Sequence, residues 1–357
     1  MANSNDNSSS PRIAVAGVSG YAGAELARLL LLHPRITPEC LLFLGRPDTE
    51  TAIQLDALHP QLTGLAPVAS QVEPFSWKQI DAFRTEFLFL ATPHQQSREW
   101  APLAVTQGLR VIDLSGAWRL HNNENRSVYN LTDVDSVAMA SFQEEAVFGS
   151  PELHRSAITS ARLVANPGCY STSIILALVP LLRAELVDLD QGIICDSKSG
   201  VSGAGKIPSA KTHFMYAADN LSAYSAFGHR HTGELLEQLA LTTEQIQFTP
   251  HLLPIPRGIL STIYLKLRRP ARPSDIEHTF RSFYASSPMV RIRSSGTLPQ
   301  IQHVVHTNFC DLGFVLGPDN RRMVLVSCLD NLLKGAAGQA VQNLNLMLGW
   351  GEAEGLS

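Results

Sequence analysis

A cluster of glycines at positions 17–23 (GVSGYAG) limits what this chain can fold into more than any other feature. Residues 12–16 (RIAVA), which precede it and are apolar after Arg12, predict a short buried strand, and residues 25–32 predict a helix. Glycines at such a junction let the backbone approach a pyrophosphate, and the free N–H groups at the helix start face the anion. The spacing is Gly-x-x-Gly-x-x-Gly rather than Gly-x-Gly-x-x-Gly, so a plain turn is the alternative. The strand before and the helix after favour a dinucleotide-binding site.

Three more apolar segments continue the pattern of the first half. Residues 40–44, 87–90 and 111–114 predict strands, and enough chain for a helix separates most of them. This alternation is typical of an α/β fold with a Rossmann-type, doubly wound parallel sheet.

The pattern changes after about Pro151. One of the strands predicted there alternates apolar and polar residues, as half-buried antiparallel strands do. The predicted strands are residues 162–165, 193–196, 261–267, 290–293 and 323–328. We therefore expect an α+β domain with a mixed or antiparallel sheet.

The length of 357 residues suggests two domains. Residues 1–10 are rich in Asn and Ser and predict a disordered tail. The other expected units are a dinucleotide-binding domain at 11–160, a catalytic α+β domain at 161–328, and a C-terminal segment at 329–357. That last segment contains an amphipathic helix, which we expect to pack back on the dinucleotide-binding domain.

Charge, hydropathy and cysteine content exclude several classes of protein. The net charge is −4 and no basic arm is present, so a nucleic-acid partner is not expected. The longest apolar run, 174–182, is too short to span a membrane. The five cysteines are widely spaced and contain no Cys-x-x-Cys pair, which indicates reduced thiols in the cytoplasm rather than disulfides or a zinc site.

The end of the second predicted strand selects the form of a nicotinamide dinucleotide. An acidic residue there would bind the ribose hydroxyls, but Glu39 lies at the start of the strand. The strand ends at Gly45-Arg46, and a cation there suits the extra phosphate of NADP. The alternative is that Arg46 is only a solvated surface charge.

Cys169 is the one cysteine with a chemical context. It follows a predicted strand and Asn166-Pro167-Gly168, and it begins a predicted helix. A thiol at a helix N-terminus has its pKa lowered to roughly 3.5–7.5. The nearby N–H groups could also stabilise an oxyanion. The sequence therefore predicts a reactive thiolate, with a buried structural cysteine as the alternative.

A thiol nucleophile works with a base, and His229 and His231 form a dense polar cluster with Arg230. One histidine could serve as the base and the other could contact the substrate. A metal site is not favoured, because no third ligand lies near His-x-His at a spacing typical of metal sites.

The loop 199–206 almost matches the phosphate-binding loop of nucleoside triphosphatases. Position 207 is Ile, however, where a magnesium-binding Ser or Thr is needed. We interpret this loop as glycine-rich backbone beside the nicotinamide, with a plain flexible loop as the alternative.

Taken together, these segments resemble the N-acetyl-γ-glutamyl-phosphate reductases of the aspartate-semialdehyde dehydrogenase superfamily. The similarity covers nearly the whole chain after the tail. The segments that carry it are residues 20–26 (GYAGAEL), 113–115 (DLS), 166–170 (NPGCY), 229–232 (HRHT) and 248–254 (FTPHLLP).

The resemblance implies a thiolate at Cys169, a base at His229 and the residues needed to hold substrate and cofactor. The substrate residues are Ser115, Arg119, Asn166, Tyr224 and His231. The cofactor residues are Gly17, Ser19, Gly20, Tyr21, Gly23, Arg46, Pro93, Ser199, Gly200, Gly203 and Asn331, and no metal is expected. The Arg119 fork would suit an acyl phosphate or a carboxylate.

The implied reaction is the NADPH-dependent reduction of N-acetyl-γ-glutamyl phosphate to the semialdehyde, a step of arginine biosynthesis, through a thioester on Cys169. The family also implies a homodimer or homotetramer. The nearest alternative is a reductase of N-acetyl-α-aminoadipyl phosphate or aspartyl phosphate. A non-catalytic cofactor-sensing protein and a phosphotransferase are alternatives of other classes.

Overall fold

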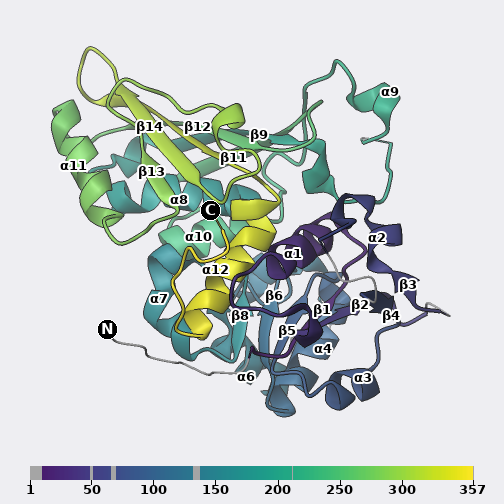
Figure 1. The fold of residues 1–357 in the computed structure, drawn as a ribbon. Coiled ribbons are helices and arrows are strands. Elements are labelled where there is room, and N and C mark those ends of the chain that lie inside the picture. The colour runs from purple at the N-terminus through teal and green to yellow at the C-terminus, as the bar shows by residue number, and fades with distance from the viewer. Residues whose placement is uncertain (1–9, 49–50, 66–69, 132–136, 211, 357) are drawn as a thin grey trace, which may run out of the picture.

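The computed structural model describes residues 10–48, 51–65, 70–131, 137–210 and 212–356. All but the last residue of the expected N-terminal tail lies outside these ranges. The described chain forms two β-sheets, one built from residues before position 166 and one from residues after position 192 (Figure 1). No helix within the described ranges is long and apolar enough to cross a membrane.

The first sheet has eight strands in the order β3-β4-β2-β1-β5-β6-β8-β7. Every neighbouring pair is parallel except β3–β4. The strands are β1 (Ile13–Ala16), β2 (Leu41–Leu44), β3 (Ile53–Gln54), β4 (Gln71–Glu73), β5 (Phe87–Leu90), β6 (Arg110–Asp113), β7 (Val147–Phe148) and β8 (Leu163–Ala165). The predicted parallel sheet is confirmed.

Helices cover both faces of this sheet because the side chains of each strand alternate in direction. Ile13 and Val15 of β1 pack in a cluster with apolar side chains of α1 (Tyr21–Leu31) and α12 (Gly338–Met347). Ala14 and Ala16 pack in another cluster with α4 (His94–Thr106). The glycine cluster ends at the start of α1, which begins at Tyr21 and therefore earlier than the predicted residue 25.

The second sheet has seven strands in the order β10-β11-β9-β12-β15-β14-β13. Its pairs are both parallel and antiparallel, as expected for a mixed sheet. The strands are β9 (Ile193–Gly200), β10 (Ser222–Ala223), β11 (Ile246–Leu253), β12 (Ile259–Lys266), β13 (Val290–Ile292), β14 (Cys310–Leu316) and β15 (Arg322–Leu329). β9 continues to Gly200, beyond the predicted end at residue 196, because it pairs with β11 and β12 on both sides.

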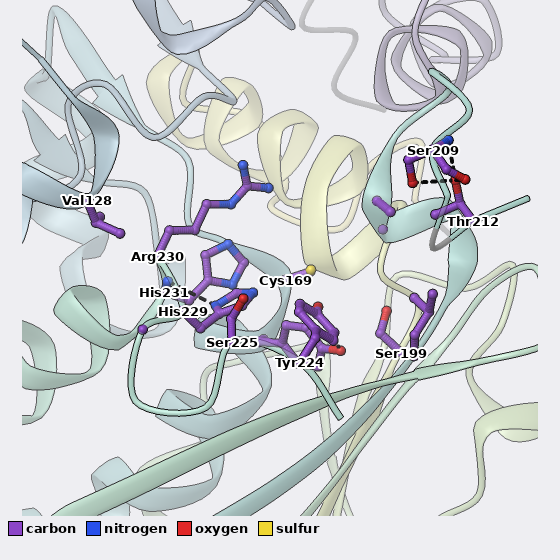
Figure 2. Close-up of a pocket in the computed structure, with 15 residues that line it drawn as sticks. Val128, Cys169, Ser199, Ser209, Thr212, Tyr224, Ser225, His229, Arg230 and His231 are labelled. Atoms are coloured by element: carbon purple, nitrogen blue, oxygen red, sulfur yellow. Dashed lines mark hydrogen bonds between the residues drawn. The ribbon is translucent and has the colours of Figure 1, made fainter. Parts of the chain in front are cut away.

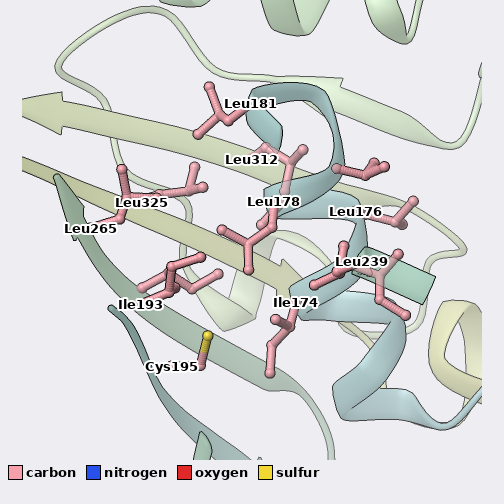
Figure 3. Packing of buried hydrophobic residues seen from close by; sticks show 14 of the residues in the cluster. Ile174, Leu176, Leu178, Leu181, Ile193, Cys195, Leu239, Leu265, Leu312 and Leu325 are labelled. Carbon is pink, nitrogen blue, oxygen red and sulfur yellow. The ribbon is translucent and has the colours of Figure 1, made fainter. Parts of the chain in front are cut away.

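Helix α8 (Cys169–Arg183) forms the core of the second half. Its side chains from Tyr170 to Leu181 are all buried. Figure 3 shows Ile174, Leu178 and Leu181 of this helix facing side chains of the sheet such as Ile193 and Leu325. This packing fixes the helix and therefore the position of its first residue.

The C-terminal helix α12 follows a π-helical turn at Leu333–Ala337. It packs against α1 and α7 (Pro151–Ser160), and it lies beside α7 in Figure 1.

The remaining α-helices in the described ranges are α2 (Leu55–Leu58), α3 (Trp77–Ala82), α5 (Asn123–Arg126), α6 (Val137–Glu145), α9 (Phe214–Ala217), α10 (Thr232–Leu239) and α11 (Pro273–Phe283). Short 3₁₀ turns occur at Pro38–Cys40, Pro60–Leu62, Ser127–Tyr129, Leu189–Gln191, Val201–Ala204 and Ile301–His303.

Candidate active site

Cys169 is the first residue of α8, as the sequence predicts, and it lies where two cavities meet. Gly168 is the N-cap and makes no side-chain cap, so α8 begins with uncapped N–H groups. The Cys169 side chain is partly exposed. Cys169, Gly203, Arg230 and His231 line both cavities.

The first cavity, which we call the histidine cavity, lies between α8, the end of β9 and residues 224–231. Its aromatic walls are close together: the ring centroids of Tyr170 and His229 are 5.5 Å apart, and those of His229 and His231 are 4.7 Å apart. Ser199 and Tyr224 also line it. Figure 2 shows Cys169 between the two histidines and Ser199.

A hydrogen bond distinguishes the two histidines. The backbone N–H of His231 donates to Nδ1 of His229 at 3.1 Å. The neutral His229 ring therefore carries its proton on Nε2 and presents a donor there. Burial, with a contribution from the charge of Arg230, lowers the pKa of His229 to about 4. Burial also lowers the pKa of His231 well below its usual value.

Glu234 of α10 is a fully buried carboxylate that joins three parts of the site. Its Oε2 accepts from the backbone N–H of Gly168 at 2.9 Å, and its Oε1 accepts from Arg119 at 3.1 Å. Nε2 of His231 lies 4.0 Å from the same Oε1. Sequence reasoning did not single out Glu234, because its partner Arg119 lies 115 positions away.

The second cavity, which we call the glycine cleft, runs along the carboxyl edge of the parallel sheet. Its walls include the start of α1, the loops after β5 and β6, and the π-helical turn before α12. Besides Cys169 and His231, the predicted residues that line it are Gly20, Tyr21, Gly23, Pro93, Ser115, Arg119, Gly203 and Asn331. This edge is where open α/β sheets bind dinucleotides.

Gly17 and Gly23 make the close packing of this loop possible. Gly17 has φ +84°, and a Cβ there would lie 2.3 Å from the carbonyl oxygen of Ala91. A Cβ on Gly23 would lie 2.4 Å from the carbonyl oxygen of Gly17. Gly17 itself does not line the glycine cleft.

Arg46 and Ser19 lie together in a hollow at the end of β2. Lys206 of the second glycine-rich loop lines the same hollow, and its Nζ donates to the backbone oxygen of Ser19 at 3.2 Å. The side chain of Arg46 is exposed. A second cation at this place was not foreseen, since Lys206 comes from a distant part of the chain.

Three predicted residues bond to or pack against protein groups, and two of them line neither cavity. Nε and both terminal nitrogens of Arg119 donate to Asn166, Leu114 and Glu234. The side chain of Asn166 donates to the oxygen of Ala336, and Asn166 lines neither cavity. Gly200 is packed against the backbone of residues 255–257 and also lines neither cavity.

The expected lowering of the Cys169 pKa is wrong. Although Cys169 keeps some exposed surface, desolvation by the protein around it raises the pKa of the thiol. Opposing contributions come from the charges of Arg230 and Arg119 and from the N–H of Tyr170, but they do not outweigh the loss of water. The thiol is therefore protonated at neutral pH until a base or a ligand changes its surroundings.

The alternative of a nucleoside-triphosphate loop is not supported. The helix of such a loop starts directly after its lysine, but residues 207–210, which follow Lys206, contain a bend and a turn and no helix. Across the described ranges, no group of three or more His, Cys, Asp or Glu side chains could hold a metal ion.

Models of known protein families match both halves of the chain. The family model described as "Semialdehyde dehydrogenase, NAD binding domain" matches residues 12–161. The model described as "Semialdehyde dehydrogenase, dimerisation domain" matches residues 169–331. The fold and the site therefore define an oxidoreductase of the semialdehyde dehydrogenase type.

Curated relatives narrow the class. Proteins named N-acetyl-gamma-glutamyl-phosphate reductase from Shouchella clausii (strain KSM-K16) and Geobacillus stearothermophilus are each 40% identical, over 96% of this chain and 97% of theirs. One from Desulforapulum autotrophicum is 41% identical over 97% of both chains. The chain belongs to the N-acetyl-γ-glutamyl-phosphate reductase family.

Solved structures agree on the fold. Aspartate semialdehyde dehydrogenase II from Vibrio cholerae, complexed with ASA, superimposes with a TM-score of 0.70 at 17% identity, covering 96% of this chain and 99% of that one. A probable aspartate-semialdehyde dehydrogenase from Pseudomonas aeruginosa gives 0.67 at 19% identity, covering 95% and 98%.

Proposed function

We propose that this protein reduces N-acetyl-γ-glutamyl phosphate to N-acetylglutamate 5-semialdehyde with NADPH, releasing phosphate, through a thioester on Cys169. The observation that carries this proposal is the position of Cys169, which lines both the glycine cleft and the histidine cavity. A hydride donor in the glycine cleft and an acyl phosphate in the histidine cavity would meet at one sulfur. The names of the curated relatives supply the substrate.

The start of α1 suits a dinucleotide. Gly20 is its N-cap without a side-chain cap, and no acidic residue lies in its first turn. The N–H groups there are therefore free to face a pyrophosphate. Arg46 and Lys206 favour the extra phosphate of NADP over NAD. When bound, the reduced nicotinamide supplies the hydride.

The chemistry begins with the loss of the thiol proton of Cys169. The sulfur then attacks the acyl carbon, the bond to the phosphate oxygen breaks, and a thioester remains. We expect the N–H groups at the start of α8, which has no side-chain cap, to stabilise the oxyanion. After reduction, the hemithioacetal collapses: the carbon–sulfur bond breaks, the aldehyde leaves, and the sulfur regains a proton.

We expect His229 and His231 to have different roles in the reaction. The family resemblance implies His229 as the base. Its Nδ1 already accepts a hydrogen bond, however, so its Nε2–H is better suited to donate to a substrate oxygen. Nδ1 of His231 is buried and has no hydrogen-bond partner among the described residues, and the Glu234 carboxylate faces the other side of its ring. We therefore assign the proton transfer to and from sulfur to His231.

Substrate anions need a free cation. Because Nε and both terminal nitrogens of Arg119 already donate to protein acceptors, we expect Arg119 to hold the loop before Cys169 in place. Arg230 is exposed and lines both cavities, so it is the better candidate for the substrate carboxylate or phosphate. Ser115, Tyr224 and Asn166 remain predicted substrate residues, and the homodimer or homotetramer remains a prediction.

The test is an assay in the reverse direction with phosphate and NADP. The semialdehydes of N-acetylglutamate, N-acetyl-α-aminoadipate and aspartate are compared by kcat/KM. The proposal requires N-acetylglutamate semialdehyde to have the highest value. A higher value for either of the other two would transfer the function to that related reductase.

A further inference from the structure

Lys334 is a lysine with no exposed surface, and the mechanism above does not use it. It precedes Gly335, the residue that packs against the candidate nucleophile Cys169. A Cβ on Gly335 would lie 2.7 Å from Cβ of Cys169, so the backbone there is in direct contact with the reactive cysteine. A fully buried ammonium beside such a contact needs an explanation, because burying a charge is costly unless it is paired.

The partner of Lys334 is Glu152, in the first turn of α7, which is also fully buried. Nζ of Lys334 donates to Oε1 of Glu152 at 2.7 Å and to the side-chain oxygen of Gln342 at 2.8 Å. The charge of Lys334 helps to hold the pKa of Glu152 below its usual value, although burial opposes it. One ammonium therefore connects the π-helical turn to α7 and α12, which lie side by side (Figure 1).

The turn that carries Lys334 has two sides. Leu332, Gly335 and Ala336 line the glycine cleft, while Lys334 is turned into the protein interior. The N–H of Gly335 bonds to the oxygen of Asp330, five residues back, and the N–H of Ala337 bonds to that of Leu332. A π-helical turn holds one residue more than an α-helical turn and is frequent at functional sites. Relaxation to α-helix would rotate neighbouring residues by about 100° per position.

We propose that Lys334 and Glu152 are positioning residues that keep this turn in its π register, so that Gly335 remains packed against Cys169. A buried ion pair adds little net stability compared with apolar side chains of the same size. The pair does specify geometry, because the ammonium must reach a carboxylate on α7 and an amide on α12 at once. The inference rests on the proposed function only in taking Cys169 as the nucleophile.

The test uses the neutral double variant Lys334→Met/Glu152→Gln, which leaves no unpaired charge behind. We expect its thermal midpoint to stay near that of the parent, while kcat falls at least tenfold. If Gly335 moves away, water reaches the sulfur, and alkylation of Cys169 by iodoacetamide at pH 7 becomes several-fold faster. Faster alkylation with slower turnover is a result that general destabilisation at a distant place does not produce.

The matched control is Arg291→Met, which breaks an ion pair to the fully buried carboxylate of Asp311 in the second sheet. It should lower the thermal midpoint without changing the alkylation rate. The inference is overturned if the double variant keeps the parent's alkylation rate and kcat. If the double variant does not fold, Glu152→Gln alone is measured, and an unchanged alkylation rate overturns the inference in the same way. Alkylation needs neither acyl phosphate nor NADPH, so this result is independent of the proposed substrate.

Discussion

Oε2 of Glu234 accepts a hydrogen bond at 2.9 Å from the backbone N–H of Gly168, the residue immediately before Cys169. The other oxygen of the same carboxylate pairs with Arg119 and faces His231. One buried side chain thus fixes the peptide that leads into α8, a guanidinium and an imidazole. The position of the thiol relative to its proton carrier depends on this carboxylate.

Glu234→Gln should impair both stability and catalysis. The amide can still accept from Gly168, but Arg119 loses its buried counter-charge, which typically costs about 3–5 kcal/mol of unfolding free energy. We expect kcat to fall by roughly 10²-fold, because His231 loses the charge that stabilises its protonated form. Steady-state kinetics and denaturant unfolding measure the two effects.

Glu237→Gln is the control for that experiment. Glu237 lies on the same helix and accepts hydrogen bonds from the backbone N–H groups of His121 and Asn122, outside both cavities. Its substitution should leave kcat within about twofold of the parent. An equal loss of kcat in both variants would mean that α10 acts only as a scaffold.

The thiol of Cys169 should lose its proton only at high pH. Because burial raises the pKa of Cys169, the thiolate fraction is small at neutral pH. The rate of alkylation should keep rising as the pH passes the ordinary thiol pKa of 9.0. A plateau reached below pH 7 would instead support the thiolate expected from the helix N-terminus alone.

Acid should destabilise the fold through His229 and His231. The pKa of His229 is about 4 in the folded protein, below the 6.5 of a free histidine, so the unfolded chain binds more protons between these values. The stability that neutral His229 provides is complete above pH 6.5 and is lost as the pH falls toward 4. His231 shifts in the same direction. Thermal midpoints across this range should fall less steeply in His229→Gln than in the parent.

Cofactor preference should depend on Arg46. Arg46→Asp removes a charge-assisted contact to the extra phosphate, worth about 1.5–3 kcal/mol, and adds repulsion. The KM for NADPH should rise by roughly 10- to 100-fold, while that for NADH changes little. Equal changes in both constants would show that Arg46 is only a surface charge.

Much of the fold can be predicted from the chain, because its strongest signals are local. Buried strands such as β5, the glycine junction before α1 and the start of α8 at Cys169 each show a short pattern in sequence. β9 is longer than its apolar core predicts, because pairing with β11 and β12 extends it through polar residues to Gly200.

The site is less predictable, because its energetics depend on distant partners. The pKa of Cys169 rises through burial that no local pattern reveals. Glu234 pairs with Arg119, which lies 115 positions away in the sequence. The hydrogen bond that Nδ1 of His229 accepts from the backbone of His231 can be seen only in the structure. The choice of histidine therefore required the structure.

The central claim is a covalent acyl group on one sulfur. Mass spectrometry of the intact protein, mixed with N-acetyl-γ-glutamyl phosphate in the absence of NADPH, tests it most directly, with Cys169→Ser as the control. We expect one N-acetylglutamyl group in place of the thiol hydrogen, located on the peptide that contains Cys169 and absent from the control. Turnover on addition of NADPH without any such adduct, or an adduct that persists in Cys169→Ser, would contradict the account.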